Sequence, residues 1–347
     1  MAERILSERE LNRAVLARQL LLERSRLSLP RALERIGGIQ AQYAPSMYVG
    51  AWSRLEGFER EALTRALKRR SVVQATLIRA TIHLVSARDY WPFELAVAKT
   101  RREMWLGYGR RAAETDAREM AGLARTVAAR FRGEALTRKE IQEIAGDAMR
   151  TNGVGMWIDL VRVPPSGTWE RRRADIYALA EDWVGPPGAD GRAAAERLVR
   201  AYLTGFGPAA PAGIADWAGL KPASVGPVLA RLEPRRFRTE DGSELVDLPR
   251  LPLPDPETPA PPRFLPTWDA TLLVHCRRAQ ILPEELRPRV FSTKTPQSVP
   301  TFLVDGQVAG AWRWEKDRIR LEPFRKLAAA ERKRVEAEAE RLAEFHR

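Results

Sequence analysis

The spacing of hydrophobic residues is helical in some segments of the chain and strand-like in others. Helical segments followed by strand-like ones recur as blocks. The predicted elements of the first block are three helices and then two strands, over residues 7–24, 28–37, 60–69, 72–78 and 81–85. A Ser7-x-x-Glu10 capping box starts the first helix, and Gly37-Gly38 ends the second. Helices followed by a two-stranded hairpin, the wing, are typical of a winged helix-turn-helix unit.

The same order returns twice. In the second block, Ser86-x-x-Asp89 and Thr137-x-x-Glu140 each cap a helix, residues 153–163 are extended, and residues 164–167 form a turn. The third block contains helices over residues 192–203, 211–218 and 222–232, followed by a hairpin turn at 240–243. The short turn at residues 219–221 gives its last two helices helix-turn-helix spacing.

The end of the chain differs from these blocks. Prolines crowd residues 249–266, which is typical of an extended connector. Beyond it, residues 271–274, 301–304 and 308–314 are strand-like, Asp305-Gly306 predicts a tight hairpin, and residues 326–344 predict a charged amphipathic helix.

We therefore expect a mainly α protein with small β wings, an α+β fold. It should contain three tandem winged helix-turn-helix units and a C-terminal β-rich subdomain with a terminal helix. The expected divisions are three units, a connector and the C-terminal subdomain, over residues 1–90, 91–185, 186–250, 251–266 and 267–347.

Composition and net charge limit the partners and cofactors that the chain is expected to have. The chain has 347 residues with a net charge of +13, so a polyanion such as nucleic acid is the expected partner. Its single cysteine, Cys276, excludes an internal disulfide and zinc modules based on cysteine, and we expect neither a metal nor a cofactor. The N-terminus lacks the apolar segment of a secretory signal, and no apolar run of about eighteen residues occurs. We expect a cytoplasmic, nucleoid-associated protein without membrane contact.

Four segments together resemble a known family. They are Gly38-Ile39-Gln40-Ala41-Gln42-Tyr43, Trp52-Ser53-Arg54-Leu55, Arg79 to Val85, and Trp268-Asp269 to Arg278. In order and spacing, over nearly the whole chain, they are similar to the bacterial winged-helix DNA glycosylases of the AlkZ and YcaQ type. The resemblance implies a C-shaped array of three winged units that surrounds DNA and excises cationic alkylpurines, crosslinked ones included. It also implies that Gln40 and Gln42, in the family's Gln-apolar-Gln signature, are catalytic.

Two amides suit this chemistry. An N3- or N7-alkylated purine already carries a positive charge, so its glycosidic bond breaks toward an oxocarbenium-like sugar without a general acid. A carboxamide accepts and donates hydrogen bonds, so Gln40 and Gln42 would order the attacking water. Neutral bases such as uracil should be poor substrates. Because no lysine stands near the triplet, no lyase step is expected.

Further residues are candidates for contact with DNA. The resemblance places Arg79 and His83 in a segment where Ala80 replaces the usual glycine. It places His275 and Arg278 in a segment that lacks the usual serine and inner aspartate, with Val274 and Arg277 departing from the pattern. Arg171 and Arg172 follow the second wing and are candidate phosphate contacts. From the residues alone, each of these groups also fits a structural or solvent-facing role.

Other functions remain open at this stage. Gln40 and Gln42 also fit a role as caps of the preceding helix. A non-catalytic winged-helix regulator would have the same fold and charge, and would read sequence with the helix at residues 222–232. A homologue that has lost activity is the third alternative. The leading hypothesis is a monomeric, monofunctional glycosylase whose partner is double-stranded DNA carrying alkylated purines.

Overall fold

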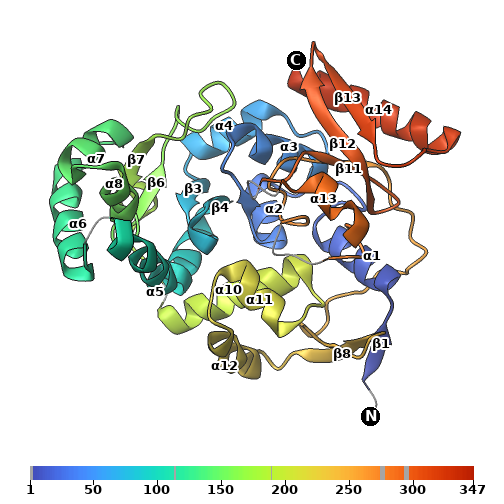
Figure 1. Ribbon diagram of the computed structural model, residues 1–347, viewed down its shortest axis with the longest axis horizontal. Coiled ribbons are helices and arrows are strands. Elements are labelled where there is room, and N and C mark those ends of the chain that lie inside the picture. Colours follow the sequence, from blue (N-terminus) through green and yellow to red (C-terminus); the bar gives the residue numbers. More distant parts are fainter. Residues whose placement is uncertain (1–2, 113–114, 189, 274–277, 293–296) are drawn as a thin grey trace.

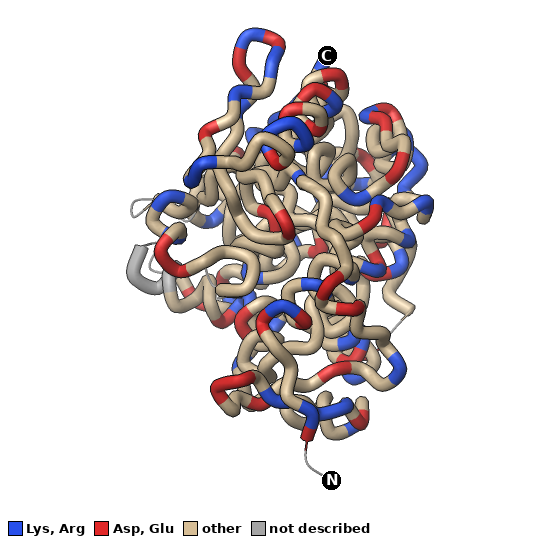
Figure 2. The backbone as a smooth tube through the Cα atoms, turned by 90° about the vertical axis from the view of Figure 1, so that its right-hand side faces the viewer, with Lys and Arg blue, Asp and Glu red and all other residues tan. Residues whose placement is uncertain are grey.

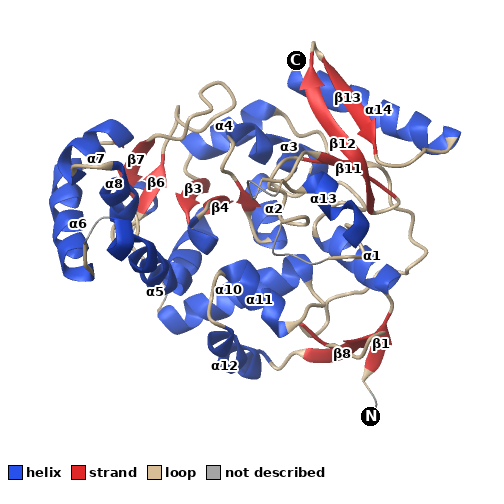
Figure 3. Ribbon diagram, in the orientation of Figure 1, coloured by secondary structure: helices blue, strands red, loops and turns tan. Residues whose placement is uncertain are grey.

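The protein is described by a computed structural model over residues 3–112, 115–188, 190–273, 278–292 and 297–347. Helices predominate, and the strands form small sheets between and beside them (Figure 1, Figure 3). The mainly α, α+β fold class is therefore confirmed. Within those ranges, no helix has the length and apolar character needed to cross a membrane.

The helices of the described residues are α1 (Glu8–Arg18), α2 (Leu29–Ile36), α3 (Ala44–Arg54), α4 (Arg60–Lys68), α5 (Ala87–Ala112), α6 (Ala117–Phe131), α7 (Arg138–Ala145), α8 (Ala148–Val154), α9 (Ala180–Val184), α10 (Gly191–Phe206), α11 (Pro211–Ala218), α12 (Pro222–Leu232), α13 (Arg287–Val290) and α14 (Ala329–His346), with 3₁₀ turns η1 (Ile78–Ala80) and η2 (Glu284–Leu286). The strands are β1 (Arg4–Leu6), β2 (Ile39–Gln40), β3 (Val72–Thr76), β4 (Ile82–Ser86), β5 (Leu136–Thr137), β6 (Leu160–Arg162), β7 (Ile176–Leu179), β8 (Arg235–Thr239), β9 (Glu244–Asp247), β10 (Arg263–Leu265), β11 (Thr301–Val304), β12 (Gln307–Glu315) and β13 (Arg318–Pro323).

The wings of the first two blocks join into one sheet. Its strand order is β2-β4-β3-β6-β7-β5, and β3 pairs antiparallel with β6 through Gln74 opposite Arg162 and Ala75 opposite Val161. The two blocks therefore share backbone hydrogen bonds as well as side-chain packing.

The third wing and the C-terminal subdomain have sheets of their own. In the third wing the order is β1-β8-β9, and the N-terminal strand β1 pairs in parallel with β8. The C-terminal sheet is antiparallel, in the order β10-β11-β12-β13, and α14 packs on it. Helix α10 crosses the centre of the main core, where Leu198, Leu203 and Phe206 are buried with Trp217 of α11.

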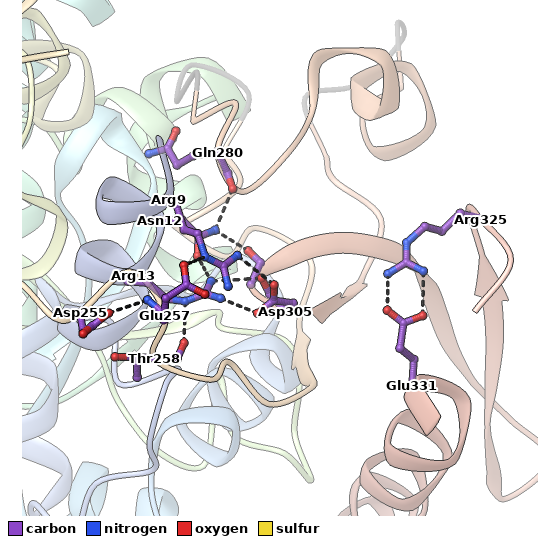
Figure 4. A network of polar contacts seen from close by, with 11 residues as sticks. Arg9, Asn12, Arg13, Asp255, Glu257, Thr258, Gln280, Asp305, Arg325 and Glu331 are labelled. Atoms are coloured by element: carbon purple, nitrogen blue, oxygen red, sulfur yellow. Dashed lines mark hydrogen bonds and ion pairs between the residues drawn. The ribbon is translucent and has the colours of Figure 1, made fainter. Parts of the chain in front are cut away.

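Helix α1 holds the turn between β11 and β12 (Figure 4). Asn12 donates to the Gly306 carbonyl at 2.9 Å and to the Gln280 carbonyl at 2.7 Å. Arg13, which is buried, pairs with the Asp305 carboxylate and donates to the Thr258 carbonyl at 2.8 Å. The first turn of the C-terminal helix is fixed separately, where Arg325 forms two hydrogen bonds with Glu331.

Several predicted elements match the structure. The Ser7 and Thr137 capping boxes both form. The strands of the first wing, the helix-turn-helix of the third block, the strand at residues 301–304 and the C-terminal helix lie within a few residues of their expected bounds.

Four expectations were wrong in detail. The first helix ends at Arg18 instead of Arg24, because Leu20 adopts a left-handed conformation that no sequence signal marks. Residues 153–163 are not extended throughout, since α8 runs to Val154 and β6 covers only Leu160–Arg162. The proline-rich segment contains strand β10.

The fourth wrong expectation concerns residues 271–273, which form a turn instead of a strand. The Thr271 backbone N–H and hydroxyl both donate to the Asp269 carboxylate and stabilise this turn. Val274 lies outside the described residues. Helix α3 was not anticipated, and every one of its residues is buried, so the chain shows no polar face there.

Candidate active site

The glutamine triplet is attached to the first wing by backbone pairing. Gly37 and Gly38 both have positive φ angles, 80° and 83°, and turn the chain from α2 into β2. A Cβ atom on Gly38 would lie 3.0 Å from the Leu84 carbonyl oxygen, so glycine permits the close approach of β2 to β4. Gln40 then pairs with His83, and the Ala41 N–H donates to the Ile82 carbonyl at 2.7 Å. The triplet therefore has a fixed position at the edge of the sheet.

A polar relay fixes the two amide side chains. Arg79 donates through Nη1 to the Trp217 carbonyl and through Nη2 to Gln40 Oε1, at 3.1 Å in the second case. Gln40 Nε2 in turn donates to Gln42 Oε1. Gln40 is only 4% exposed, whereas Gln42 is exposed. The relay therefore ends in an oriented, solvent-accessible carboxamide whose oxygen has a second lone pair for a water.

His83 is buried directly across the strand pair from Gln40. Its Nδ1 lies 3.0 Å from the Thr81 carbonyl oxygen and 3.4 Å from the Thr81 hydroxyl. The structure thus places the expected DNA contacts Arg79 and His83 beside Gln40, within the support of the triplet.

A cavity of about 330 Å³ opens beside Gln42, between the first two wings. Its lining combines Ala80, Thr81 and Ile82 with Arg138, Arg162 and Tyr177 of the second block. Arg162 donates to the Thr76 hydroxyl at 3.0 Å and stacks on Tyr177 at 5.2 Å, and burial lowers the pKa of its guanidinium. Sequence reasoning missed both arginines, because only the pairing of β3 with β6 brings them to the triplet.

The arginines of the second wing lie in the turn between β6 and β7. Both are exposed. Arg171 pairs with Asp175 at 3.5 Å, and Arg172 donates to the Tyr43 hydroxyl at 3.1 Å. Since Tyr43 follows Gln42 in the chain, the structure brings Arg172 close to the triplet and leaves Arg171 on the same turn.

Of the two C-terminal candidates for DNA contact, the structure describes only Arg278. His275 lies outside the described residues. Arg278 is only 8% exposed, donates to the Ala270 carbonyl at 2.9 Å and lies over the Phe206 ring at 4.5 Å. Asp269 accepts two hydrogen bonds from Arg54, at 2.9 and 3.0 Å. Burial alone would raise the pKa of Asp269, but Arg54 and Thr271 lower it overall, so the carboxylate stays ionised in a structural ion pair.

Positive and negative side chains are interleaved over the surface. In Figure 2, Lys and Arg segments alternate with Asp and Glu segments along the visible face. Many arginines are paired, such as Arg231 with Glu196 and Arg313 with Glu322. The excess charge of +13 therefore acts as a general attraction for a polyanion.

Comparison with known proteins assigns the family. Residues 33–345 match the family described as DNA glycosylase AlkZ-like. This chain belongs to that family. The fold of this glycosylase also matches the solved structure of Streptomyces sahachiroi DNA glycosylase AlkZ, with a TM-score of 0.82 and 20% sequence identity over 98% of this chain and 97% of the other. No curated protein sequence matches the glycosylase.

The glycosylase has a third-unit helix poorly suited to reading bases. Ala223, Gly226, Pro227 and Ala230, all exposed on α12, offer no side-chain hydrogen bonds to base edges. The helix also exposes Ser224 and Arg231, but Arg231 is paired with Glu196 at 2.5 Å. Lys221, at its N-cap, is paired with Glu103 at 2.8 Å. Family and helix together favour an enzyme that acts on DNA over a regulator that reads sequence with this helix.

Proposed function

We propose that this glycosylase hydrolyses the N-glycosidic bond of cationic N-alkylpurines in double-stranded DNA. The observation that carries the proposal is the relay from Arg79 through Gln40 to the exposed Gln42. An alkylated purine leaves as a neutral base, so the enzyme has to place a water and stabilise developing positive charge on the sugar. Two oriented amides do this without a formal base at neutral pH.

The two glutamines have different tasks in this proposal. Gln42, which is exposed, contacts the attacking water through its amide oxygen. Gln40 is buried, and both ends of its amide are engaged, by Arg79 and by Gln42. Gln40 therefore fixes the orientation of Gln42, and its N–H occupies one lone pair of the Gln42 oxygen so that the other is directed toward the water.

The cavity beside Gln42 suits a DNA phosphate better than the damaged base. Arg138 and Arg162 would repel a purine that carries a positive charge and attract a phosphate oxygen. Because Gln42 lines the same cavity, a phosphate held there would bring the adjoining part of the DNA strand close to Gln42. Because Gln42 is exposed, the purine need not leave the duplex completely, and we extend the proposal to bulky adducts and interstrand crosslinks, acted on by a monomer.

The deciding experiment measures base release from two duplexes, one with a single 7-methylguanine and one with a nitrogen-mustard crosslink. Alkali then converts abasic sites to strand breaks. Wild type should give breaks only after alkali, since none of the described residues that line the Gln42 cavity is a lysine. A uracil duplex should stay intact, because its neutral leaving group needs stronger assistance.

Substitution of the glutamines tests their assignment. Gln40→Ala and Gln42→Ala should each slow single-turnover excision by roughly ten- to a thousandfold while DNA binding is largely kept. Because one relay joins them, the double variant should be hardly slower than the worse single variant. Gln142→Ala, at an exposed position of α7, is the matched control and should excise like wild type. Release of no alkylated base by wild type, or full activity in the Gln42 variant, would refute the proposal.

A further inference from the structure

A second cavity, here called the aromatic pocket, is lined by Tyr43, the residue that follows the triplet. Its volume is about 400 Å³, within the range of pockets that hold small ligands. The walls come from distant parts of the chain and include Tyr43, Trp169, Trp312, Trp314 and His346. Gln42 lines the first cavity and Tyr43 lines this one, so successive residues face different sites.

Three of these rings are accessible. Tyr43 is 41% exposed, and Trp169 and Trp314 are each partly exposed. Behind Trp314, the His346 ring stacks at 4.7 Å between centroids and 21° between planes. Trp169 is braced by an edge contact with Tyr48 at 5.5 Å. The rings are therefore held in place by packing before any ligand arrives.

The pocket also contains polar atoms without a partner. Among the described residues, neither Ser46 Oγ nor His346 Nε2 has a hydrogen bond, although both atoms are buried. Ser46 is only 3% exposed and lines the pocket. A buried hydroxyl without a partner costs about 1–3 kcal/mol. Such atoms are expected where a ligand supplies the missing hydrogen bond.

Two arginines give the pocket a phosphate-binding rim. Arg172 and Arg313 both line it and both are exposed, and Arg313, which is paired with Glu322, would share its guanidinium with the phosphate. Arg172 is attached to the aromatic wall through the Tyr43 hydroxyl. Aromatic faces with polar atoms inside and guanidinium groups at the edge are the combination that binds a nucleotide, with its base stacked and its phosphate outside.

We propose that the aromatic pocket receives a nucleobase of the bound DNA that is not the base being excised. The occupant stacks on Trp314, with Trp169 in another part of the lining, hydrogen-bonds to Ser46 and leaves its phosphate at Arg172 and Arg313. It is a different base from the substrate, because the Gln42 amide opens on the other cavity. A base that has lost its pairing partner beside the damage supplies this ligand at the lowest cost in pairing energy.

The test uses a duplex in which 2-aminopurine stands opposite a tetrahydrofuran abasic analogue, so that one base is unpaired and no excision is required. Wild type should quench the 2-aminopurine emission as the base stacks on the rings. Trp314→Leu should lose this quenching and bind the duplex roughly 5- to 100-fold more weakly, the range for loss of one stacking platform. Binding to a fully paired duplex of the same sequence should not change.

Two further variants secure the interpretation. Trp183→Leu removes a partly exposed tryptophan that stacks with Arg70 at 4.1 Å on α9, and should behave like wild type. Ser46→Leu fills the pocket and keeps its rings, and should also abolish quenching, so it decides the matter if Trp314→Leu does not fold. Quenching and affinity that persist in a folded Trp314 or Ser46 variant would overturn the proposal. Since the assay needs no base release, its failure is distinct from a failure to excise 7-methylguanine.

Discussion

Arg79 links the candidate active site to the third helix-turn-helix unit through one side chain. Its backbone has a φ of 53°, as does that of Ala80, in the left-handed region that non-glycine residues rarely adopt. This strained turn directs the guanidinium to the Trp217 carbonyl and to Gln40 together. Strain of this kind persists where surrounding contacts over-determine the backbone, as they do here.

The first prediction separates a positioning arginine from a phosphate-binding one. Arg79→Gln should slow excision of 7-methylguanine by about tenfold or more, because Gln40 loses its anchor. It should leave unchanged the slope of log affinity against log salt for undamaged duplex. Arg172→Gln should lower that slope by about one, as expected for loss of one phosphate contact.

The opposite pattern would show that Arg79 binds a DNA phosphate and does not position Gln40. An Arg79→Gln enzyme with a normal excision rate and a salt slope reduced by about one would show that its guanidinium leaves Gln40 and pairs with the backbone of DNA.

At the scale of elements, the turn between β11 and β12 is confined by α1. Gly306 has a φ of 81°, and a Cβ atom there would lie 2.5 Å from Asn12 Oδ1 and 2.6 Å from Leu16 Cδ1. Gly306→Ala should lower the free energy of unfolding by about 2 to 4 kcal/mol, from backbone strain and steric overlap together.

The hairpin turn of the third wing offers a control for that prediction. Gly242 has a φ of 84°, and a Cβ atom there would meet no atom within 4 Å. Gly242→Ala should therefore cost only the backbone term, about 1 kcal/mol. Urea unfolding of both variants gives the comparison, and equal losses would show that α1 does not confine the turn.

The end of α14 should respond to pH through His346. Burial, together with the positive charges of Arg60 and Arg172, lowers the pKa of its ring from 6.5 to about 4. The unfolded chain then takes up a proton at a higher pH than the folded one. The stabilisation is complete above pH 6.5 and is lost as the pH falls toward 4.

Comparison of wild type with His346→Phe isolates this effect from the carboxylates that titrate in both proteins. As the pH falls from 6.5 to 4, the melting temperature of wild type should decrease relative to that of the His346→Phe variant. A difference independent of pH would mean that His346 stays neutral in the unfolded chain over this window or accepts its proton without cost in the folded one.

How far sequence patterns predicted these elements depends on burial. Wing strands and half-buried helices show a polar face, so their periodicity was visible. Helix α3 has no polar residue exposed to solvent, and its pattern was invisible. The triplet and Arg79 were found by resemblance, but the role of Arg79 as a support of Gln40 was not. Its contact with the Trp217 carbonyl, and the position of Arg162 in the Gln42 cavity, arise only through tertiary structure. The aromatic pocket draws on positions as distant as Tyr43 and His346, which no local pattern connects.

At the scale of the whole molecule, binding to undamaged DNA should be electrostatic. The surface carries interleaved charges with a net excess of +13, and α12 offers few groups that read bases (Figure 2). Affinity for undamaged duplex should therefore fall by orders of magnitude between about 50 and 200 mM salt, with little dependence on sequence. Fluorescence anisotropy on several duplexes would measure this, and a single strongly preferred site with a shallow salt slope would contradict it.

The strand β1 has a consequence for how the protein associates with itself. By pairing with β8, it places that strand at the centre of the third wing, where both of its edges are hydrogen-bonded. Removal of residues 1–7 would leave the β8 backbone open along one side and uncover Phe237, which packs against Leu6. An open edge beside an apolar side chain is a template for strand addition by a second molecule. Strand β1 is therefore expected to protect the third wing from strand addition, and a variant without it should self-associate more readily than wild type.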